Sequence, residues 1–142
     1  MPIQIRKLVR PLALRELAPE YGEDFISVWV NPPRAMLEAY AAARAESRAV
    51  TKRMAELASQ DGEVSREDRQ AVASRLLEVN QHFFAWFAEI WSQSEDPATR
   101  VTTDKVKELA IRSETDDPAL WEFLVHGTWR LIDEHRQHAK KG

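Results

Sequence analysis

The sequence predicts a mainly α-helical protein of about four helices, which include an antiparallel helical hairpin, with a small strand element near the N-terminus. Apolar residues recur at alternating spacings of four and three after residue 33, as they do along one face of an α-helix. A short β-branched and aromatic run that suits a strand occurs within the first thirty residues. Only four glycines occur, and the seven prolines stand mainly at the ends of patterned segments. These observations favour helices joined by short breaks.

The length and composition bound the class of protein. A chain of 142 residues fits a single domain, which we divide into a strand-containing segment, 1–32, and a helical body, 33–139. The absence of cysteine excludes disulfide frameworks and thiolate metal sites. The net charge of −3 and pI of 5.8 provide no basic field for nucleic acid. Without an apolar run of roughly 20 residues or a secretory signal, we expect no membrane span and a cytoplasmic location.

Two strands are predicted before the helices begin. Residues 3–9 alternate apolar and polar side chains at their start, and residues 25–30 form the β-branched and aromatic run. Residues 12–17 are expected to form a turn or short helix between two prolines. The sequence Asn31-Pro32-Pro33 should end the second strand and open the first helix, because proline suits the first helical turn.

The next two segments predict the hairpin. One helix begins at Arg34 and carries the seam Met36, Tyr40, Ala43, Ser47, Val50, Met54 and Leu57. After a turn at 59–64, a second begins at Ser65, whose hydroxyl can cap it, and carries the seam Val72, Leu76, Val79, Phe83, Trp86 and Ile90. Matched seams joined by a short turn favour antiparallel packing, although both seams could instead face one common core. A second apolar stripe on the later helix consists of Leu77, Phe84, Phe87 and Trp91.

Two further helices follow a polar break at 94–100. A short one is expected after Thr102 or Thr103, with Val106, Leu109 and Ala110 on one face. The pair Asp117-Pro118 predicts the start of the last helix, as an acidic cap followed by proline at the first helical position. This last helix is rich in apolar residues as far as residue 132 and then becomes polar through 135–141.

A search for catalytic or metal-binding residues yields no candidate. His135 and His138 are three residues apart, but a zinc site needs three or four ligands, and a solvated helix end explains the pair better. The sequence contains no glycine-rich phosphate loop, nucleophile elbow or paired-histidine protease motif. Basic residues of the first helix interleave with glutamates, which favours a salt-bridged surface over a nucleic-acid track. We therefore predict no catalytic, cofactor-binding or metal-binding residue.

Aromatic residues supply the candidate binding surface. Five tryptophans occur, and the later helices are apolar on more than one side. Tryptophan is enriched at binding hot spots, and large exposed apolar patches often mark binding sites. The predicted partner-binding residues are Trp29, Trp91, Trp121, Phe123, Leu124 and Trp129. Trp29 is expected to face away from Val28 and Val30. Trp121 and Trp129 either share a docking stripe or belong to the core, and the sequence does not decide between these.

Two segments carry a family resemblance. Tyr21–Pro33, a short strand running into a helix start, and Phe87–Gln93, a helix end carrying Trp91, resemble the tail assembly chaperones of long-tailed bacteriophages. The likeness covers about residues 21–132 and continues through Val101-Thr102-Thr103 into the next helix. After Trp91 the chain departs from the family, since Asp96-Pro97 stands where the family commonly has an asparagine and an acidic-glycine turn.

The resemblance implies a function in protein binding. It implies a protein that coats the tape-measure protein and helps recruit tail-tube subunits in the host cytoplasm, without a cofactor or a bond-making step. A structural virion component and a generic helical adaptor are the alternatives, and a small enzyme ranks last. Self-association into a homo-oligomer is a further candidate.

Overall fold

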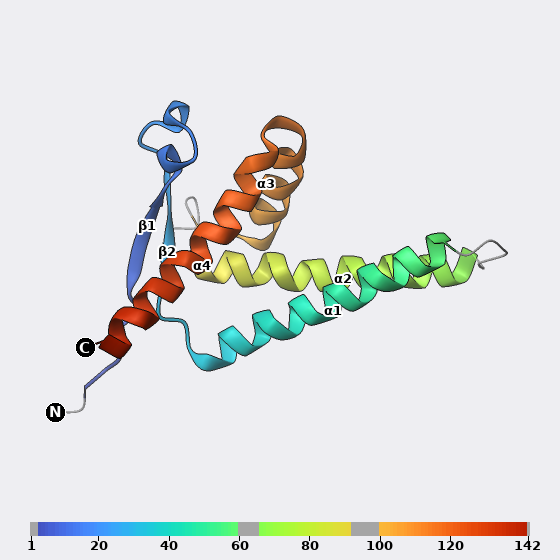
Figure 1. Ribbon diagram of the computed structural model, residues 1–142, viewed down its shortest axis with the longest axis horizontal. Coiled ribbons are helices and arrows are strands. Elements are labelled where there is room, and N and C mark those ends of the chain that lie inside the picture. Colours follow the sequence, from blue (N-terminus) through green and yellow to red (C-terminus); the bar gives the residue numbers. More distant parts are fainter. Residues whose placement is uncertain (1–2, 60–65, 92–99, 142) are drawn as a thin grey trace. The chain divides into compact units, whose positions relative to one another are not determined.

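The computed structural model describes residues 3–59, 66–91 and 100–141 of the chain (Figure 1). Its elements are the strands β1 (Val9–Ala13) and β2 (Phe25–Trp29) and the helices α1 (Arg34–Ser59), α2 (Arg66–Trp91), α3 (Thr103–Asp116) and α4 (Pro118–Lys141). Two 3-10 turns, Leu14–Glu16 and Pro19–Tyr21, separate the strands. The predicted mainly α fold with a small N-terminal strand element is confirmed. The contacts group the chain into two compact units, which we call the ribbon unit (Met1–Pro33 with Phe87–Gly142) and the hairpin unit (Arg34–Trp86).

The hairpin unit pairs α1 with α2 in opposite directions (Figure 1). The Trp86 indole Nε1–H donates to the Met36 carbonyl at 2.8 Å, and farther along, Arg75 pairs with Glu46 at 3.1 Å. The contact positions rise along α1 as they fall along α2, so the helices are antiparallel and the hairpin prediction is confirmed. Most of the predicted turn and the predicted cap at Ser65 lie outside the described residues.

The predicted seams are the least exposed sides of the two helices. Tyr40 and Trp86 are 9% and 6% exposed with ring centroids 4.7 Å apart, and Leu57 and Val79 are buried nearer the far end. The additional apolar stripe on α2 is exposed at its start and buried at its end. Leu77 is 62% exposed, whereas the Phe87 and Trp91 side chains are packed inside the ribbon unit.

The ribbon unit contains an antiparallel two-stranded sheet in which Pro11 lies opposite Ser27. Backbone bonds from Leu14 N to Asp24 O and from Val30 N to Leu8 O flank the ladder, so even-numbered residues of both strands point their amides toward the partner strand. The amide position of Pro11 therefore points outward, where the lack of an N–H costs no ladder bond. The predicted first strand, 3–9, is wrong: the strand begins at Val9, because pairing with β2 sets its limits and Pro11 does not interrupt it.

One face of this sheet, the inner face, packs against α4 (Figure 1). Its residues Leu12, Val28 and Val30 are fully buried. The helix approaches the strand closely at Gly127, where an added Cβ would lie 2.7 Å from the Leu12 Cδ2. Glycine at this position thus permits a helix–strand contact closer than any side chain allows.

Helices α3 and α4 meet at Asp117 with caps at both starts. The Thr102 hydroxyl accepts from the Lys105 amide at 3.3 Å, and the Asp117 Oδ1 accepts from the Ala119 amide at 3.3 Å, so both predicted helix starts are confirmed. Ser113 joins the two helices: its buried hydroxyl donates to the Asp117 carbonyl at 2.7 Å and accepts from the Trp121 amide at 2.9 Å.

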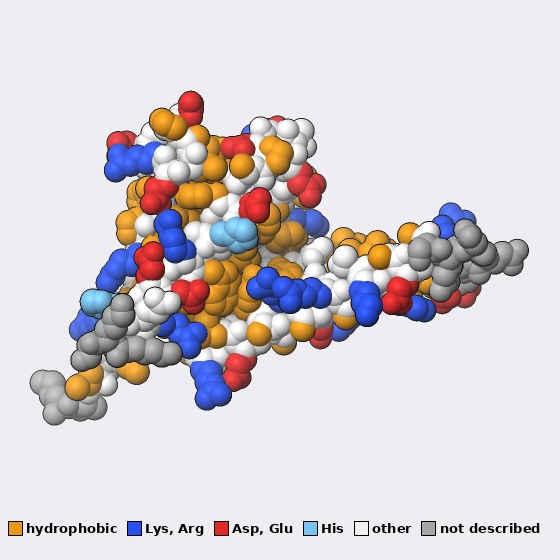
Figure 2. All heavy atoms as spheres, in the orientation of Figure 1, with side chains coloured by type: hydrophobic (Ala, Val, Ile, Leu, Met, Phe, Trp, Pro, Cys, Tyr) orange, Lys and Arg blue, Asp and Glu red, His pale blue; other side chains and the backbone are white. Residues whose placement is uncertain are grey.

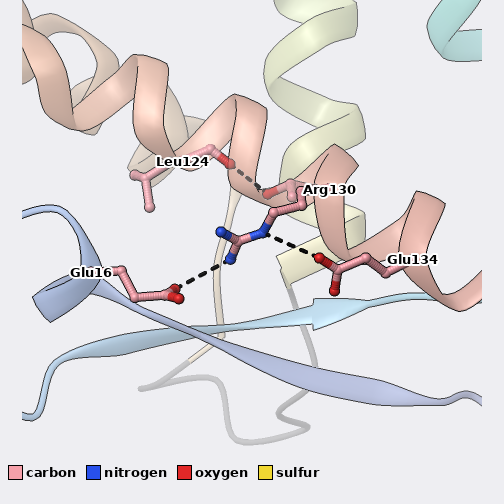
Figure 3. A network of polar contacts seen from close by, with 5 residues as sticks. Glu16, Leu124, Arg130 and Glu134 are labelled. Carbon is pink, nitrogen blue, oxygen red and sulfur yellow. Dashed lines mark hydrogen bonds and ion pairs between the residues drawn. The ribbon is translucent and has the colours of Figure 1, made fainter.

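An ion pair links α4 to the first 3-10 turn (Figure 3). Arg130 reaches Glu16 at 3.2 Å and its helix neighbour Glu134 at 3.8 Å. The Arg130 and Glu16 side chains are about half exposed, so the pair is worth at most about 1 kcal/mol. The ion pair serves mainly to hold α4 beside the first 3-10 turn, because its two residues are separated by 114 positions in the sequence.

Candidate protein-interaction surface

The six predicted partner-binding residues occupy different settings. Trp91 and Leu124 are 4% and 1% exposed, so both are core residues and we exclude them from the candidate surface. Trp121, Phe123 and Trp129 are half-buried along α4. The sixth residue, Trp29, is half-buried at the end of β2.

An aromatic cluster explains the burial of Trp91. The rings of Phe87, Trp91 and Trp121 lie with centroids 5.0 to 6.1 Å apart, within the range of favourable aromatic pairs. The Trp91 Nε1–H donates to the Thr128 hydroxyl at 3.0 Å, which donates in turn to the Leu124 carbonyl at 2.6 Å (Figure 3 shows the second bond). Trp91 is therefore a satisfied core residue that fastens α2 to α4.

The candidate residues of α4 do not form a single patch. Because a helix turns about 100° per residue, Trp121 and Trp129 lie roughly 80° apart around the axis, and Phe123 lies roughly 160° from Trp121. Trp121 faces the aromatic cluster just described. The structure thus brings Trp121 together with Phe87 and Trp91, and it places Phe123 on a different side of the helix.

Trp29 lies on the other face of the sheet, the outer face, as predicted from its alternation with Val28 and Val30. The Lys7 ammonium lies 4.1 Å from the indole centroid, a cation–π arrangement. The indole Nε1–H donates to the Asn31 Oδ1 at 3.0 Å. Trp29 is thus held in place on both sides.

Asn31 also fastens the segment that precedes β1. Its Oδ1 accepts from the Leu8 amide at 2.7 Å, and its Nδ2 donates to the Arg6 carbonyl at 2.8 Å. The side chain therefore substitutes for a strand residue beyond the end of the ladder. Sequence reasoning treated Asn31 only as part of a chain boundary.

The outer face of the sheet is a shallow apolar hollow. It has a volume of about 430 Å³ and is lined mainly by Val9, Pro11, Ala13, Phe25 and Ser27. Phe25 is 59% exposed there, which is high for a phenylalanine in a strand. Charged side chains from Arg15, Glu23 and Asp24 border one end.

A second apolar hollow lies between the helices of the hairpin unit. Its volume is about 500 Å³, and its lining residues are Met54, Leu57, Ala58, Arg69, Val72 and Ala73. Met54 is 39% exposed, and Leu77, one turn beyond Ala73 on the same side of α2, is 62% exposed. Figure 2 shows apolar side chains reaching the surface along the hairpin between charged ones. Arg69 supplies the one charge among these lining residues.

A third hollow, of about 490 Å³, lies where Tyr21 meets α3 and the start of α4. The Tyr21 hydroxyl donates to the Asp117 Oδ2 at 2.5 Å. This hydrogen bond raises the pKa of Tyr21 above its ordinary value, and desolvation and the nearby negative charge act in the same direction. Asp117 thus caps α4 with one oxygen and binds the phenol with the other.

The two cations that line this polar hollow, Arg112 and Lys105, have partners within the chain. Arg112 pairs with Asp116 at 3.8 Å, and the Lys105 ammonium donates to the Arg100 carbonyl at 2.9 Å. The cations of this hollow therefore already contact groups of the chain, while Glu108 contributes a further carboxylate to its lining.

The histidines are dispersed. His82, His126 and His138 are exposed and His135 is half-buried. Within residues 3–59, 66–91 and 100–141, no three His, Asp or Glu side chains are grouped to hold a metal ion. In the same residues, no helix has the length and apolarity of a membrane span.

Comparison of the chain with protein-family models, curated proteins and solved structures finds no match.

Proposed function

We propose that this chain is a non-catalytic protein-binding protein that acts as a tail assembly chaperone of a long-tailed bacteriophage. In the host cytoplasm it binds the tape-measure protein and helps to recruit tail-tube subunits. The resemblance of Tyr21–Pro33 and Phe87–Gln93 to that family supports the role. The apolar hollow of the hairpin unit supports the mode of binding.

The hairpin hollow is the observation that carries the proposal. Near one end of this pair of 26-residue helices, residues 54–58 of α1 and 69–73 of α2 line an apolar hollow of about 500 Å³. A groove of this kind binds one apolar side of a third helix, through side chains at i, i+3, i+4 and i+7. Met54 is an exposed part of the lining, and the exposed Leu77, one turn beyond Ala73, extends the apolar surface beyond the hollow itself. The occupant we propose is a helix of the tape-measure protein with an acidic residue that meets Arg69.

The polar hollow supports the non-catalytic part of the proposal. General acid–base chemistry requires a titratable group that can reach the substrate's proton. The Tyr21 hydroxyl is engaged by Asp117, and Arg112 is engaged by Asp116. The Tyr21–Asp117 bond joins the second 3-10 turn to the junction of α3 and α4.

Coexpression with candidate tape-measure proteins tests the function. The wild-type chain should keep the tape-measure protein in the soluble fraction and copurify with it. Met54→Lys should lose this ability, because the new ammonium enters the apolar hollow. A loss of about 2 kcal/mol, typical of a hot-spot residue, weakens binding about 30-fold.

Ala55→Lys is the matched control. It adds the same charge on the same turn, at an exposed position about 100° away around α1. Both variants should retain the wild-type melting temperature, since neither position is buried. Equal binding by the two variants would exclude the hollow as the docking site. Presence of the chain in purified mature particles would favour a structural virion component over a chaperone.

A further inference from the structure

The two edges of the β-sheet differ in their capacity to accept another strand. Odd-numbered residues of both strands direct their backbone groups outward, as the flanking hydrogen bonds establish. On β1 the central outward position is Pro11, which has no N–H. An added strand would therefore lose its central bond on that edge.

The β2 edge carries no such block. Phe25, Ser27 and Trp29 each direct an N–H and a carbonyl outward, and no described residue bonds to these groups. The Phe25 ring is 59% exposed on the adjoining outer face. An edge whose three outward positions have no partner among the described residues, beside an exposed aromatic ring, is a template for strand addition.

We propose that a second copy of this chain pairs with this edge, β2 against β2, in an antiparallel arrangement with its twofold axis at Ser27. Each Phe25 then lies opposite Trp29 of the other copy on the outer face, and Ser27 lies opposite itself. The register satisfies all three outward positions on both strands, and each cross-strand aromatic pair adds packing. The product is a four-stranded sheet with the β1 strands at its outer edges, where Pro11 prevents further growth.

Charge complementarity supports a copy of this chain as the occupant. The start of β2 has a net negative charge, because Glu23 and Asp24 stand there against one cation, Arg15, whose Nη1 lies 3.9 Å from the Glu23 Oε1. The end of β2 is basic, because Lys7 lies over the Trp29 indole. Antiparallel pairing places the acidic start of each strand beside the basic end of the other, which favours this register over a parallel one.

A single cysteine tests the register, because the chain has none of its own. Antiparallel hydrogen-bonded partners have Cα atoms about 5.5 Å apart, a separation that a disulfide spans. Ser27→Cys in the full chain should therefore oxidise to a disulfide-linked dimer. Ala13→Cys, on the outward side of β1, should remain uncrosslinked, since the two β1 strands are separated by three strand spacings, about 14 Å. Equal crosslinking of both variants, or none at Ser27→Cys, would overturn the proposed register.

A proline variant tests the edge itself. Ser27→Pro removes the central outward N–H of β2 and leaves the β1–β2 ladder intact, as Pro11 does directly opposite. Light scattering after size-exclusion chromatography should give twice the chain mass for wild type and for Ser27→Ala, and a single chain mass for Ser27→Pro. Circular dichroism should give the same helix content for all three.

Two outcomes would refute the proposal. A wild-type chain that is monomeric at millimolar concentration has no such interface, even if it binds an extended peptide from another protein. A dimer that survives both Ser27→Pro and the exposed-site variant Phe25→Asp uses a different surface. If Ser27→Pro fails to fold, Phe25→Asp provides the test of the edge by itself. These results do not depend on the tape-measure experiment, because that test alters only the hairpin unit.

Discussion

Replacing Gly127 by alanine tests whether the close approach of α4 to β1 limits stability. The added Cβ would lie 2.7 Å from the Leu12 Cδ2 and 2.9 Å from its Cδ1, whereas carbon atoms pack best at about 3.5 to 4.0 Å. Leu12 is 0% exposed, so any movement that relieves the contact must repack its side chain within the core. Overpacking of this kind costs about 1–3 kcal/mol, and the gain in helix propensity offsets about 1 kcal/mol. We expect a net loss of about 1 kcal/mol.

A double-mutant cycle with Leu12→Ala separates these two effects. Leu12→Ala alone should cost about 2–5 kcal/mol, because it empties a fully buried site. In that background the steric conflict is gone, so Gly127→Ala should become stabilising by up to about 1 kcal/mol. Urea unfolding followed by circular dichroism gives each free energy, and the m-values should agree. If Gly127→Ala has the same sign and size in both backgrounds, the contact with Leu12 does not explain the glycine.

Three other features give direct expectations. The pKa of Tyr21 should lie above that of an ordinary tyrosine because its hydroxyl donates to Asp117, and desolvation and the carboxylate charge add to the effect. This interaction stabilises the folded state at pH values below the unfolded-state pKa of Tyr21. Its contribution is lost as the pH rises through the raised pKa of the folded state. Tyrosinate absorbance in a Tyr40→Phe background measures this, and a pKa at or below the ordinary value would contradict it. Ser113→Ala should lower the free energy of unfolding by about 1–3 kcal/mol, because the Trp121 amide of α4 loses the buried Ser113 hydroxyl as its acceptor. A change under about 0.5 kcal/mol, typical of surface sites, would argue against that role. Trp91→Ala should cost about 3–5 kcal/mol and lower the melting temperature, and an unchanged melting temperature would show that it is not a core residue.

The long helices were predictable because their signals are local and repeated. The seams of α1 and α2 extend over many turns, so a single misplaced residue does not alter the pattern. The caps at Thr102 and Asp117 follow from residue types next to the helix starts. The first strand was not predictable in the same way, since its limits depend on pairing with residues 25–29. Ile3 and Ile5 alternate as a strand would, yet they are 95% and 92% exposed.

The candidate surface was less predictable than the fold. An apolar pattern identifies tryptophans that avoid water, but it does not distinguish a core position from a docking position. Trp91 and Leu124 share their pattern with half-buried neighbours and prove to be packed inside. The second role of Asp117, binding Tyr21 across 96 residues, has no signal near either residue. The role of Asn31 also has no local signal, because its hydrogen bonds to residues 6 and 8 form only when β2 pairs with β1 and brings the two segments together.

The division of the ribbon unit between the two ends of the chain has a consequence for synthesis on the ribosome. The hairpin unit is one continuous segment, 34–86, and its contacts can form as soon as that segment leaves the exit tunnel. The inner face of the sheet must wait for α4, because Leu12 is covered by the helix turn at Gly127. During that interval Leu12, Val28 and Val30 are exposed on the nascent chain. A ribosome pause before α4 should therefore leave an aggregation-prone strand pair joined to a finished hairpin.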